Sequence, residues 1–107
     1  MFTTRQKIKK IIEDYKNVLS SLGIHVERVI LFGSFANGKA RKDSDIDLVV
    51  ISNDFEKLNL RERLEILGVA AARIMKPIEA KGYTIKEIHN AAQASFLEEI
   101  LETGVRI

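Results

Sequence analysis

The sequence predicts a small α/β fold in which helices alternate with short strands. With 107 residues, of which 46% are hydrophobic, the chain is expected to form a single domain, 1–107, around one core. Apolar residues recur at helical spacing in segments 4–22 and 60–75. The apolar run at 29–32 is typical of a strand that is buried on both faces, and a second apolar run lies at 46–51.

The first expected helix covers residues 4–22, and its apolar side chains form one stripe that should face the core. Gly23 follows at the point where helices commonly end in a left-handed residue. The stripe consists of Ile8, Ile11, Ile12, Tyr15, Val18, Leu19 and Leu22.

Two expected strands, 26–32 and 44–51, enclose the next loop. Gly33 ends the first strand, and residues 34–40 are long enough for one or two helical turns. The polar residues 52–54 end the second strand.

A helix over 60–75 and a strand over 78–83 should follow, with Pro77 ending the helix. A strand that includes Gly82 is expected to be weak. The face of the helix expected to point inwards consists of Leu60, Leu64, Leu67, Ala71, Ile74 and Met75.

The last part of the chain is expected to be helical. Thr84 and Glu87 match a capping box, which predicts a helix start. The helical pattern continues to Leu101 with a break near Ala94, and residues 105–107 form a tail or an edge strand.

Composition excludes several classes of protein and site. The chain has no Cys, which excludes disulfides, thiol chemistry and Cys-ligated metals. No apolar run approaches the roughly 18–20 residues of a membrane span, and the N-terminus lacks the apolar segment of a signal peptide. We therefore expect a cytoplasmic protein with no membrane partner. The net charge of +2 does not by itself indicate a nucleic-acid partner.

One carboxylate, Asp47, interrupts the second apolar run, and another, Asp45, directly precedes it. Residues two apart on a strand point to the same face, so Asp45 and Asp47 should project together, with Ile46 and Leu48 on the other side. Asp is uncommon in strands, and two close negative charges repel each other unless a cation or a proton lies between them. The pair therefore indicates a functional site; a solvated strand edge is the alternative.

Such carboxylates suit Mg²⁺, which proteins hold with a few carboxylates plus substrate phosphates. The preceding loop can accept phosphates, because Gly33 permits close backbone approach, Ser34 adds a hydroxyl and the turn exposes backbone N–H groups. Lys39, Arg41 and Lys42 add positive charge. The combination favours metal-assisted phosphoryl or nucleotidyl transfer.

A third carboxylate would complete a two-metal site, and it must come from a neighbouring strand. Glu79, between Ile78 and Ala80, is the candidate for that catalytic and metal-binding role. An outward-facing position on the strand explains this residue equally well.

Two familiar motifs match only in part. Residues 33–40, GSFANGKA, differ by one residue from the phosphate-binding loop GxxxxGK[ST], because Ala40 lacks the hydroxyl that would hold Mg²⁺. Lys39 would be indispensable in that loop and only helpful in a two-metal site. The segment from Asp43 begins like a calcium-binding EF-hand loop, but Leu48 stands where glycine is required.

The stretch GSFANGKARKDSDIDLVV, residues 33–50, resembles the Gly-Ser…Asp-x-Asp motif of the DNA polymerase beta-type nucleotidyltransferases. The length and the element order resemble the minimal nucleotidyltransferases, small domains that are often antitoxins paired with a helical HEPN-domain toxin. This resemblance covers nearly the whole chain. It implies an α+β nucleotidyltransferase fold, with a mixed sheet of three to four strands flanked by helices.

The resemblance also implies roles for site residues. Gly33 and Ser34 would hold the nucleoside triphosphate, and Asp45 and Asp47 would bind two Mg²⁺ ions. Glu79 matches the third acidic position, where the family usually has Asp; it would ligate one metal and help to activate the acceptor hydroxyl.

Asn37 stands where many members of the family have Arg. The positive charge that faces the phosphates would then come from Lys39, Arg41 or Lys42.

Antitoxins of this type are similar to enzymes that transfer AMP from ATP to a tyrosine hydroxyl of the toxin. The resemblance thus implies Mg²⁺-dependent AMPylation of a HEPN-type toxin, in a type VII-like toxin–antitoxin pair. Some relatives act only by binding, so an inactive antitoxin that neutralises its partner by contact is the alternative. Transfer to a small molecule or an RNA end is less favoured, because the sequence has no basic stripe with aromatic residues. A homo-oligomer or a hetero-oligomer with the toxin is compatible with the apolar C-terminal helix.

Overall fold

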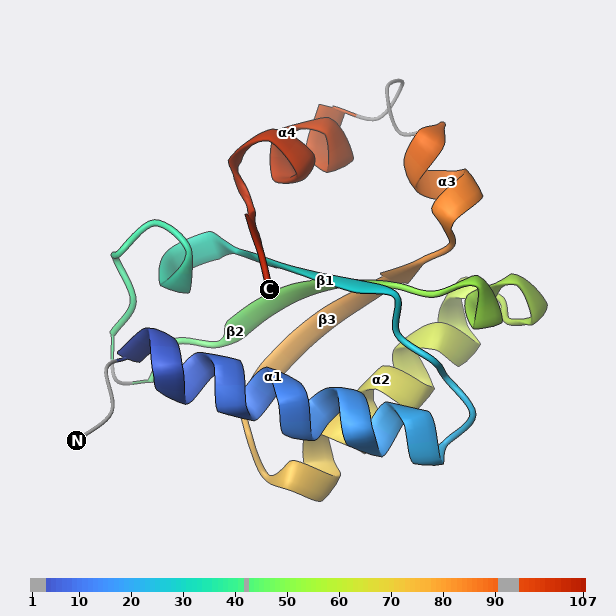
Figure 1. Cartoon of the computed structure of the whole chain (residues 1–107), viewed down its shortest axis with the longest axis horizontal. Helices are drawn as coiled ribbons and strands as arrows, with labels where there is room; N and C mark the ends of the chain where they lie inside the picture. Colours follow the sequence, from blue (N-terminus) through green and yellow to red (C-terminus); the bar gives the residue numbers. More distant parts are fainter. Residues whose placement is uncertain (1–3, 42, 91–94) are drawn as a thin grey trace.

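The computed structural model describes residues 4–41, 43–90 and 95–107, which form a four-stranded mixed sheet with helices on both faces (Figure 1). The described elements, in chain order, are α1 (Thr4–Ser21), β1 (Arg28–Phe32), η1 (Gly33–Phe35), β2 (Ile46–Ile51), η2 (Asn53–Lys57), α2 (Leu60–Ile74), β3 (Ile78–Tyr83), α3 (Ile85–His89), α4 (Ser95–Thr103) and β4 (Val105–Arg106).

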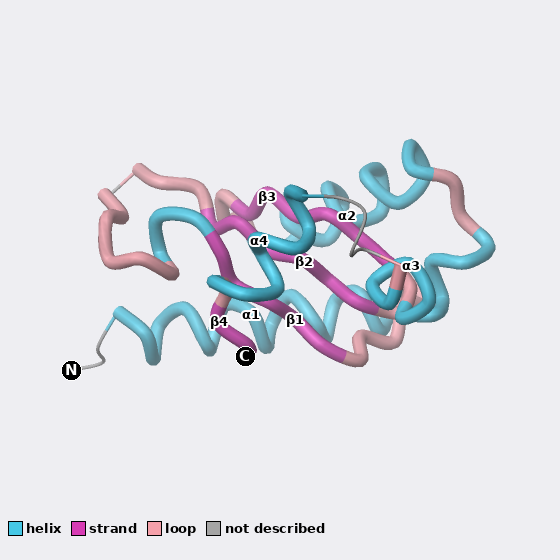
Figure 2. The backbone as a smooth tube through the Cα atoms, turned by 90° about the horizontal axis from the view of Figure 1, so that it is seen from above, coloured by secondary structure: helices cyan, strands magenta, loops and turns pink. Residues whose placement is uncertain are grey.

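The strand order in the sheet is β3-β2-β1-β4. β1 runs antiparallel to both β2 and β4, whereas β2 and β3 are parallel and are joined through α2, as a crossover between parallel strands requires. The mixed α/β fold is thereby confirmed, and the tail at 105–106 is the fourth, edge strand. Figure 2 shows α4 lying across the strands on one face of the sheet.

Helices α1 and α2 cover one face of the sheet, and α3 and α4 lie over the other (Figure 1). On β2, Ile46, Leu48 and Val50 belong to the core beneath α1 and α2, whereas Val49 and Ile51 belong to the core beneath α4. Both faces of the sheet are covered, which explains why apolar residues occupy consecutive positions on β1 and from Leu48 onwards on β2. Asp47 shares its face with Val49 and Ile51, and it therefore lies on the α4 side.

The expected stripe of α1 is confirmed as core. Its innermost side chains are those of Ile8, Ile12, Tyr15 and Leu19. The buried Tyr15 hydroxyl donates a hydrogen bond of 2.8 Å to the carbonyl of Leu67 and so ties α1 to α2.

The inner face expected for α2 is wrong in part. Leu60 is 69% exposed, Leu64 is 57% exposed and Met75 is 87% exposed. Leu67 and Ala71 are buried as expected, and Arg63 and Ala70 are buried although they were not part of the expected face.

Arg63 explains why α2 buries a different face from the one expected. Its guanidinium lies among buried acceptors that need hydrogen-bond donors, which a leucine side chain lacks. The Nε atom donates to the carbonyls of Phe55 and Leu58 at 3.1 and 3.0 Å. Nη1 donates to the Gly82 carbonyl at 3.2 Å and to Glu87 Oε1 at 2.7 Å. A buried arginine is stable when its donors are paired in this way. Leu60 and Leu64 consequently turn towards solvent.

Several predicted boundaries also shift. β2 begins at Ile46 and not at residue 44, because residues 41 and 44 close a turn in which the Arg41 N–H donates to Ser44 Oγ at 2.7 Å. After β1, one short 3₁₀ turn, η1, replaces the one or two helical turns expected. The capping box of Thr84 and Glu87 is confirmed, whereas the expected break near Ala94 lies outside the described residues.

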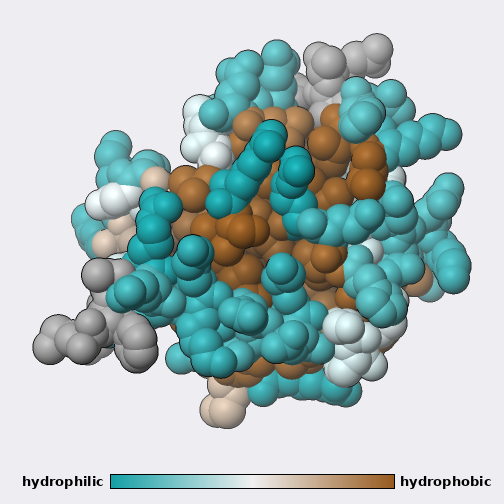
Figure 3. Space-filling model, viewed as in Figure 1, coloured by the Kyte–Doolittle hydropathy of each residue, from teal (hydrophilic) through white to brown (hydrophobic). Residues whose placement is uncertain are grey.

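Apolar side chains gather in the middle of the face seen in Figure 3, between α1 and α4, and hydrophilic side chains surround them. None of the helices in the described part of the chain combines the length and the apolarity needed to cross a membrane.

Candidate active site

The centre of the candidate site is a pair of carboxylates on neighbouring strands. Asp47 on β2 lies directly beside Glu79 on β3 in the parallel register. On its other side Asp47 lies opposite Phe32, the last residue of β1. Asp47 is half-buried and Glu79 is exposed. The sheet therefore brings together two of the three predicted carboxylates.

The electrostatics of Asp47 reflect this crowding. Burial raises the pKa of the Asp47 carboxyl, and the charges of Glu79 and Asp45 raise it further. The positive charge of Lys81 acts in the opposite direction on the same pKa. The folded chain thus disfavours the ionised form of Asp47. A cation bound beside the carboxylate would stabilise that form.

Gly33 places the loop backbone directly against Asp47. Its φ of +73° is in the left-handed region, which favours glycine. A Cβ atom added to Gly33 would collide with the Asp47 carboxylate. The expected close approach of backbone at Gly33 is therefore present, and what it approaches is the carboxylate.

The loop after Gly33 is held by its own backbone hydrogen bonds. The N–H groups of Ala36 and Asn37 donate to the Gly33 carbonyl at 3.0 and 3.2 Å, and the Lys39 N–H donates to the Ser34 carbonyl at 3.0 Å. Ser34 is the next residue after Gly33, which lies against the Asp47 carboxylate. The side chain of Lys39 is exposed, and Lys42 lies outside the described residues.

Asp45 is the predicted carboxylate whose position differs most from expectation. It precedes β2, so the strand alternation that should align it with Asp47 does not apply, and it is exposed. Within residues 4–41, 43–90 and 95–107, no three acidic or histidine side chains form a group that could hold a metal ion. The ready-made pair is Asp47 with Glu79. Mg²⁺ is usually bound by one or two carboxylates, with water and substrate phosphates as the remaining ligands. The pair of Asp47 and Glu79 provides two such carboxylates.

Lys81 is a site residue that the sequence reasoning missed. It follows Glu79 by two positions on β3, so both side chains belong to the same face of the sheet. The alternation that related Asp45 to Asp47 could have identified it, had it been applied to residues 78–83.

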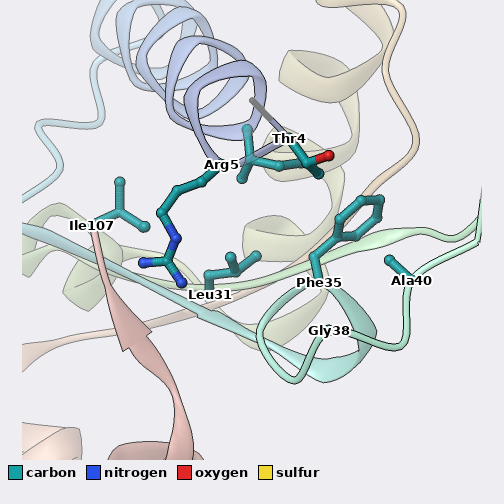
Figure 4. Close-up of a pocket in the computed structure, with 8 residues that line it drawn as sticks. Thr4, Arg5, Leu31, Phe35, Gly38, Ala40 and Ile107 are labelled. Carbon is teal, nitrogen blue, oxygen red and sulfur yellow. The ribbon is translucent and has the colours of Figure 1, made fainter. Parts of the chain in front are cut away.

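A separate hollow of about 330 Å³ lies near the loop, between α1, η1 and the chain end. Figure 4 shows the Arg5 side chain extending from α1 towards Leu31 and Ile107, with Phe35 and Ala40 on the loop side. Leu31 belongs to the core beneath α1 and α2, so this hollow and Asp47 lie on opposite faces of the sheet. The carboxylate pair is not part of it.

A Gly-Ser loop thus lies against a carboxylate on the next strand. Comparison with known protein families gives a match over nearly the whole chain. Residues 6–105 match the family model described as "Nucleotidyltransferase domain". The chain belongs to the nucleotidyltransferase family. The prediction of a nucleotidyltransferase enzyme is thereby confirmed.

A relative of this nucleotidyltransferase is named "Putative protein adenylyltransferase" and comes from Methanocaldococcus jannaschii. The two sequences are 32% identical over 108 residues, which cover 94% of this chain and 99% of the relative.

Two solved structures share the fold of this nucleotidyltransferase. One is described as "the toxin-antitoxin with AMP-PNP"; it superposes with a TM-score of 0.57 at 21% identity over 97% of this chain and 72% of that chain. The other is "a putative nucleotidyltransferase from Sulfolobus solfataricus", with a TM-score of 0.52 at 23% identity over 84% of each chain. Both support the predicted fold class.

Proposed function

We propose that this nucleotidyltransferase transfers AMP from ATP to a hydroxyl of a partner protein, a tyrosine of a HEPN-type toxin, and so acts as its cytoplasmic antitoxin. The observation that carries the proposal is the half-buried Asp47, paired with Glu79 and in contact with Gly33. The name of the Methanocaldococcus relative supports protein adenylyl transfer. The structural neighbour that is a toxin–antitoxin with AMP-PNP supports a toxin partner and an ATP-like ligand.

The donor set fits Mg²⁺. Asp47 and Glu79 supply hard carboxylate oxygens, and their mutual repulsion favours a cation. Asp45, which lies close enough to raise the pKa of Asp47, would join them when the nucleotide completes the site. We expect two ions; when bound, they would lower the pKa of the acceptor hydroxyl and stabilise the leaving pyrophosphate.

The chain's own residues would orient both substrates. Gly33 and Ser34 would receive the phosphates at the turn that opens η1, where the absence of a Cβ on Gly33 lets the backbone come close to Asp47. Lys39 and Lys42 would supply positive charge for the phosphates. Glu79, exposed on the edge strand β3, would accept a hydrogen bond from the acceptor hydroxyl.

The reaction breaks a phosphoanhydride bond of ATP and forms a phosphate ester bond to the acceptor. The acceptor oxygen attacks the α-phosphorus of ATP, the bond from that phosphorus to the β-phosphate bridging oxygen breaks, and pyrophosphate leaves. The hydroxyl proton passes first to the Glu79 carboxylate and then to water. The product is the AMP ester of the tyrosine.

The experiment is to incubate the purified chain with ATP labelled at the α-phosphate, Mg²⁺ and the protein encoded by the neighbouring gene. Label should appear on the partner. Asp47→Asn and Glu79→Gln should each reduce transfer at least about 100-fold, as expected when a group needed in the transition state is removed. Glu56→Gln removes an exposed carboxylate on η2, beyond the far end of β2, and should leave transfer unchanged.

Equal labelling by wild type and by Asp47→Asn would refute the site. Neutralisation of the toxin in cells by Asp47→Asn and Glu79→Gln would favour the alternative, an antitoxin that acts by binding alone. Labelling of RNA in place of the partner protein would point to a different acceptor class.

A further inference from the structure

Lys81 occupies a defined place beside the carboxylate pair. On the α4 face, Phe32, Asp47 and Glu79 form one row across β1, β2 and β3. The next row consists of Ile30, Val49 and Lys81. Ile30 and Val49 are buried, so Lys81 is the charged and exposed member of its row, diagonal to Asp47.

Apolar side chains share a hollow with Lys81. Lys81 lines a hollow of about 230 Å³ at the β3 edge, together with Leu60, Leu64 and Tyr83. Long charged side chains commonly cover apolar surface with their methylene groups and keep the charge in water. The two leucines that α2 turns outwards thus contribute to the surroundings of a lysine beside the site.

The charge of Lys81 lies close to the site, because Lys81 is two positions from Glu79 on the same face of β3 and diagonal to Asp47 in the register of β2 and β3. Its sign has different consequences for two ligands. A free Mg²⁺ or Mn²⁺ ion is positive and is repelled by the ammonium group. A complex of Mg²⁺ with ATP has a net negative charge and is attracted.

We infer that Lys81 makes this site selective for the metal–nucleotide complex over the free metal ion. The inference rests on the proposed function, because it takes a nucleoside triphosphate to be the substrate. A site that binds the metal chiefly as its nucleotide complex leaves Asp47 and Glu79 without a metal ion when no nucleotide is bound. Lys81 is thus a specificity-determining residue for the charge of the incoming ligand.

The test uses two binding measurements on Lys81→Met, which keeps the apolar stem and removes the charge. Binding of Mn²⁺ alone, followed by electron paramagnetic resonance of the free ion, should become roughly three- to tenfold tighter. Binding of Mg²⁺ with the non-hydrolysable analogue AMP-PNP, followed by calorimetry, should become weaker by a similar factor. Because Lys81 is exposed, the variant should keep the wild-type melting temperature within a few degrees.

Two controls separate this role from a general effect of charge. Lys81→Arg keeps the charge and should behave like wild type in both measurements. Lys86→Met removes a charge from the exposed face of α3 and should change neither. Adding Asp47→Asn to Lys81→Met should abolish the gain in Mn²⁺ affinity, because the gain arises at this carboxylate.

Opposite shifts in the two affinities support the inference; shifts in one direction, or none, overturn it. Undetectable Mn²⁺ binding by Lys81→Met would overturn it as well. A wild-type chain that binds Mn²⁺ but not Mg²⁺ with AMP-PNP would refute the proposed function. The Mn²⁺ measurement would then still decide whether Lys81 repels the free ion.

Discussion

At the scale of single residues, the site depends on the contact between Gly33 and the Asp47 carboxylate. Gly33 has φ of +73°, and the space where its Cβ would stand is filled by Asp47. Gly38, five residues later, has nearly the same backbone, with φ of +76°, but nothing lies within 4 Å of its absent Cβ. The two glycines therefore separate backbone strain from displacement of the carboxylate.

Gly33→Ala should cost more stability than Gly38→Ala and should nearly abolish transfer. Left-handed backbone costs a non-glycine residue about 1–2 kcal/mol, which both variants incur. Only Gly33→Ala also pushes Asp47 away, so its transfer rate should fall at least about 100-fold, whereas Gly38→Ala should retain most activity. Denaturant unfolding and the labelling assay measure the two effects. Equal activity in both variants would show that the contact is unimportant.

At the scale of elements, the orientation of α2 is set by Arg63. This guanidinium joins α2 to η2, β3 and α3 through four hydrogen bonds, and it stacks 5.7 Å from the centroid of the Phe55 ring. Because Glu79 and Lys81 are carried by β3, the packing of α2 on that strand also supports the site. Arg61, two residues earlier, is exposed and pairs with Glu65 within the helix.

Arg63→Met should destabilise the fold by about 3–5 kcal/mol, because it leaves buried carbonyls and Glu87 without their donor. In a chain of this size, that loss should lower the melting temperature by more than about 10 °C. Arg61→Met removes the same charge at the surface and should change stability by less than about 0.5 kcal/mol. Thermal unfolding of both variants compares them; similar melting temperatures would mean that Arg63 does not anchor α2.

At the scale of the whole molecule, the carboxylate cluster opposes the stability of the chain that carries it. The pKa of Asp47 is raised by burial and by Glu79 and Asp45. An acid with a raised folded-state pKa destabilises the fold once it ionises. That cost begins as pH rises through the unfolded pKa, about 3.9 for Asp, and is complete above the folded pKa.

Asp47→Asn should therefore raise the melting temperature at pH 7 while it abolishes transfer. The difference from wild type should shrink as the pH falls and should vanish below about 4, since Asp47 is then protonated in both the folded and unfolded states. Added Mg²⁺ together with AMP-PNP should stabilise wild type but have a smaller effect on Asp47→Asn, because a ligand that binds only the folded state stabilises that state. Scanning calorimetry at several pH values checks this. A variant less stable than wild type at pH 7 would contradict the cost assigned to Asp47.

Much of this fold could be read from local patterns. Helical spacing located α1, the apolar runs located β1 and β2, and the capping box of Thr84 located α3. These signals lie within a few neighbouring residues, and the Gly-Ser…Asp-x-Asp spacing is of the same kind. The family was therefore accessible from the sequence alone, and so were Gly33, Ser34, Asp47 and Glu79 as candidates for its site.

The tertiary structure decided what depends on partners far apart in the chain. Only the parallel register of β2 and β3 places Glu79 beside Asp47 and makes Lys81 their neighbour. The apolar pattern of α2 predicted that Leu60 would face the core, whereas the structure buries Arg63, which donates to the distant carbonyl of Gly82 and to Glu87. Sequence periodicity gives the faces of an element, whereas hydrogen bonds between elements select which face is buried.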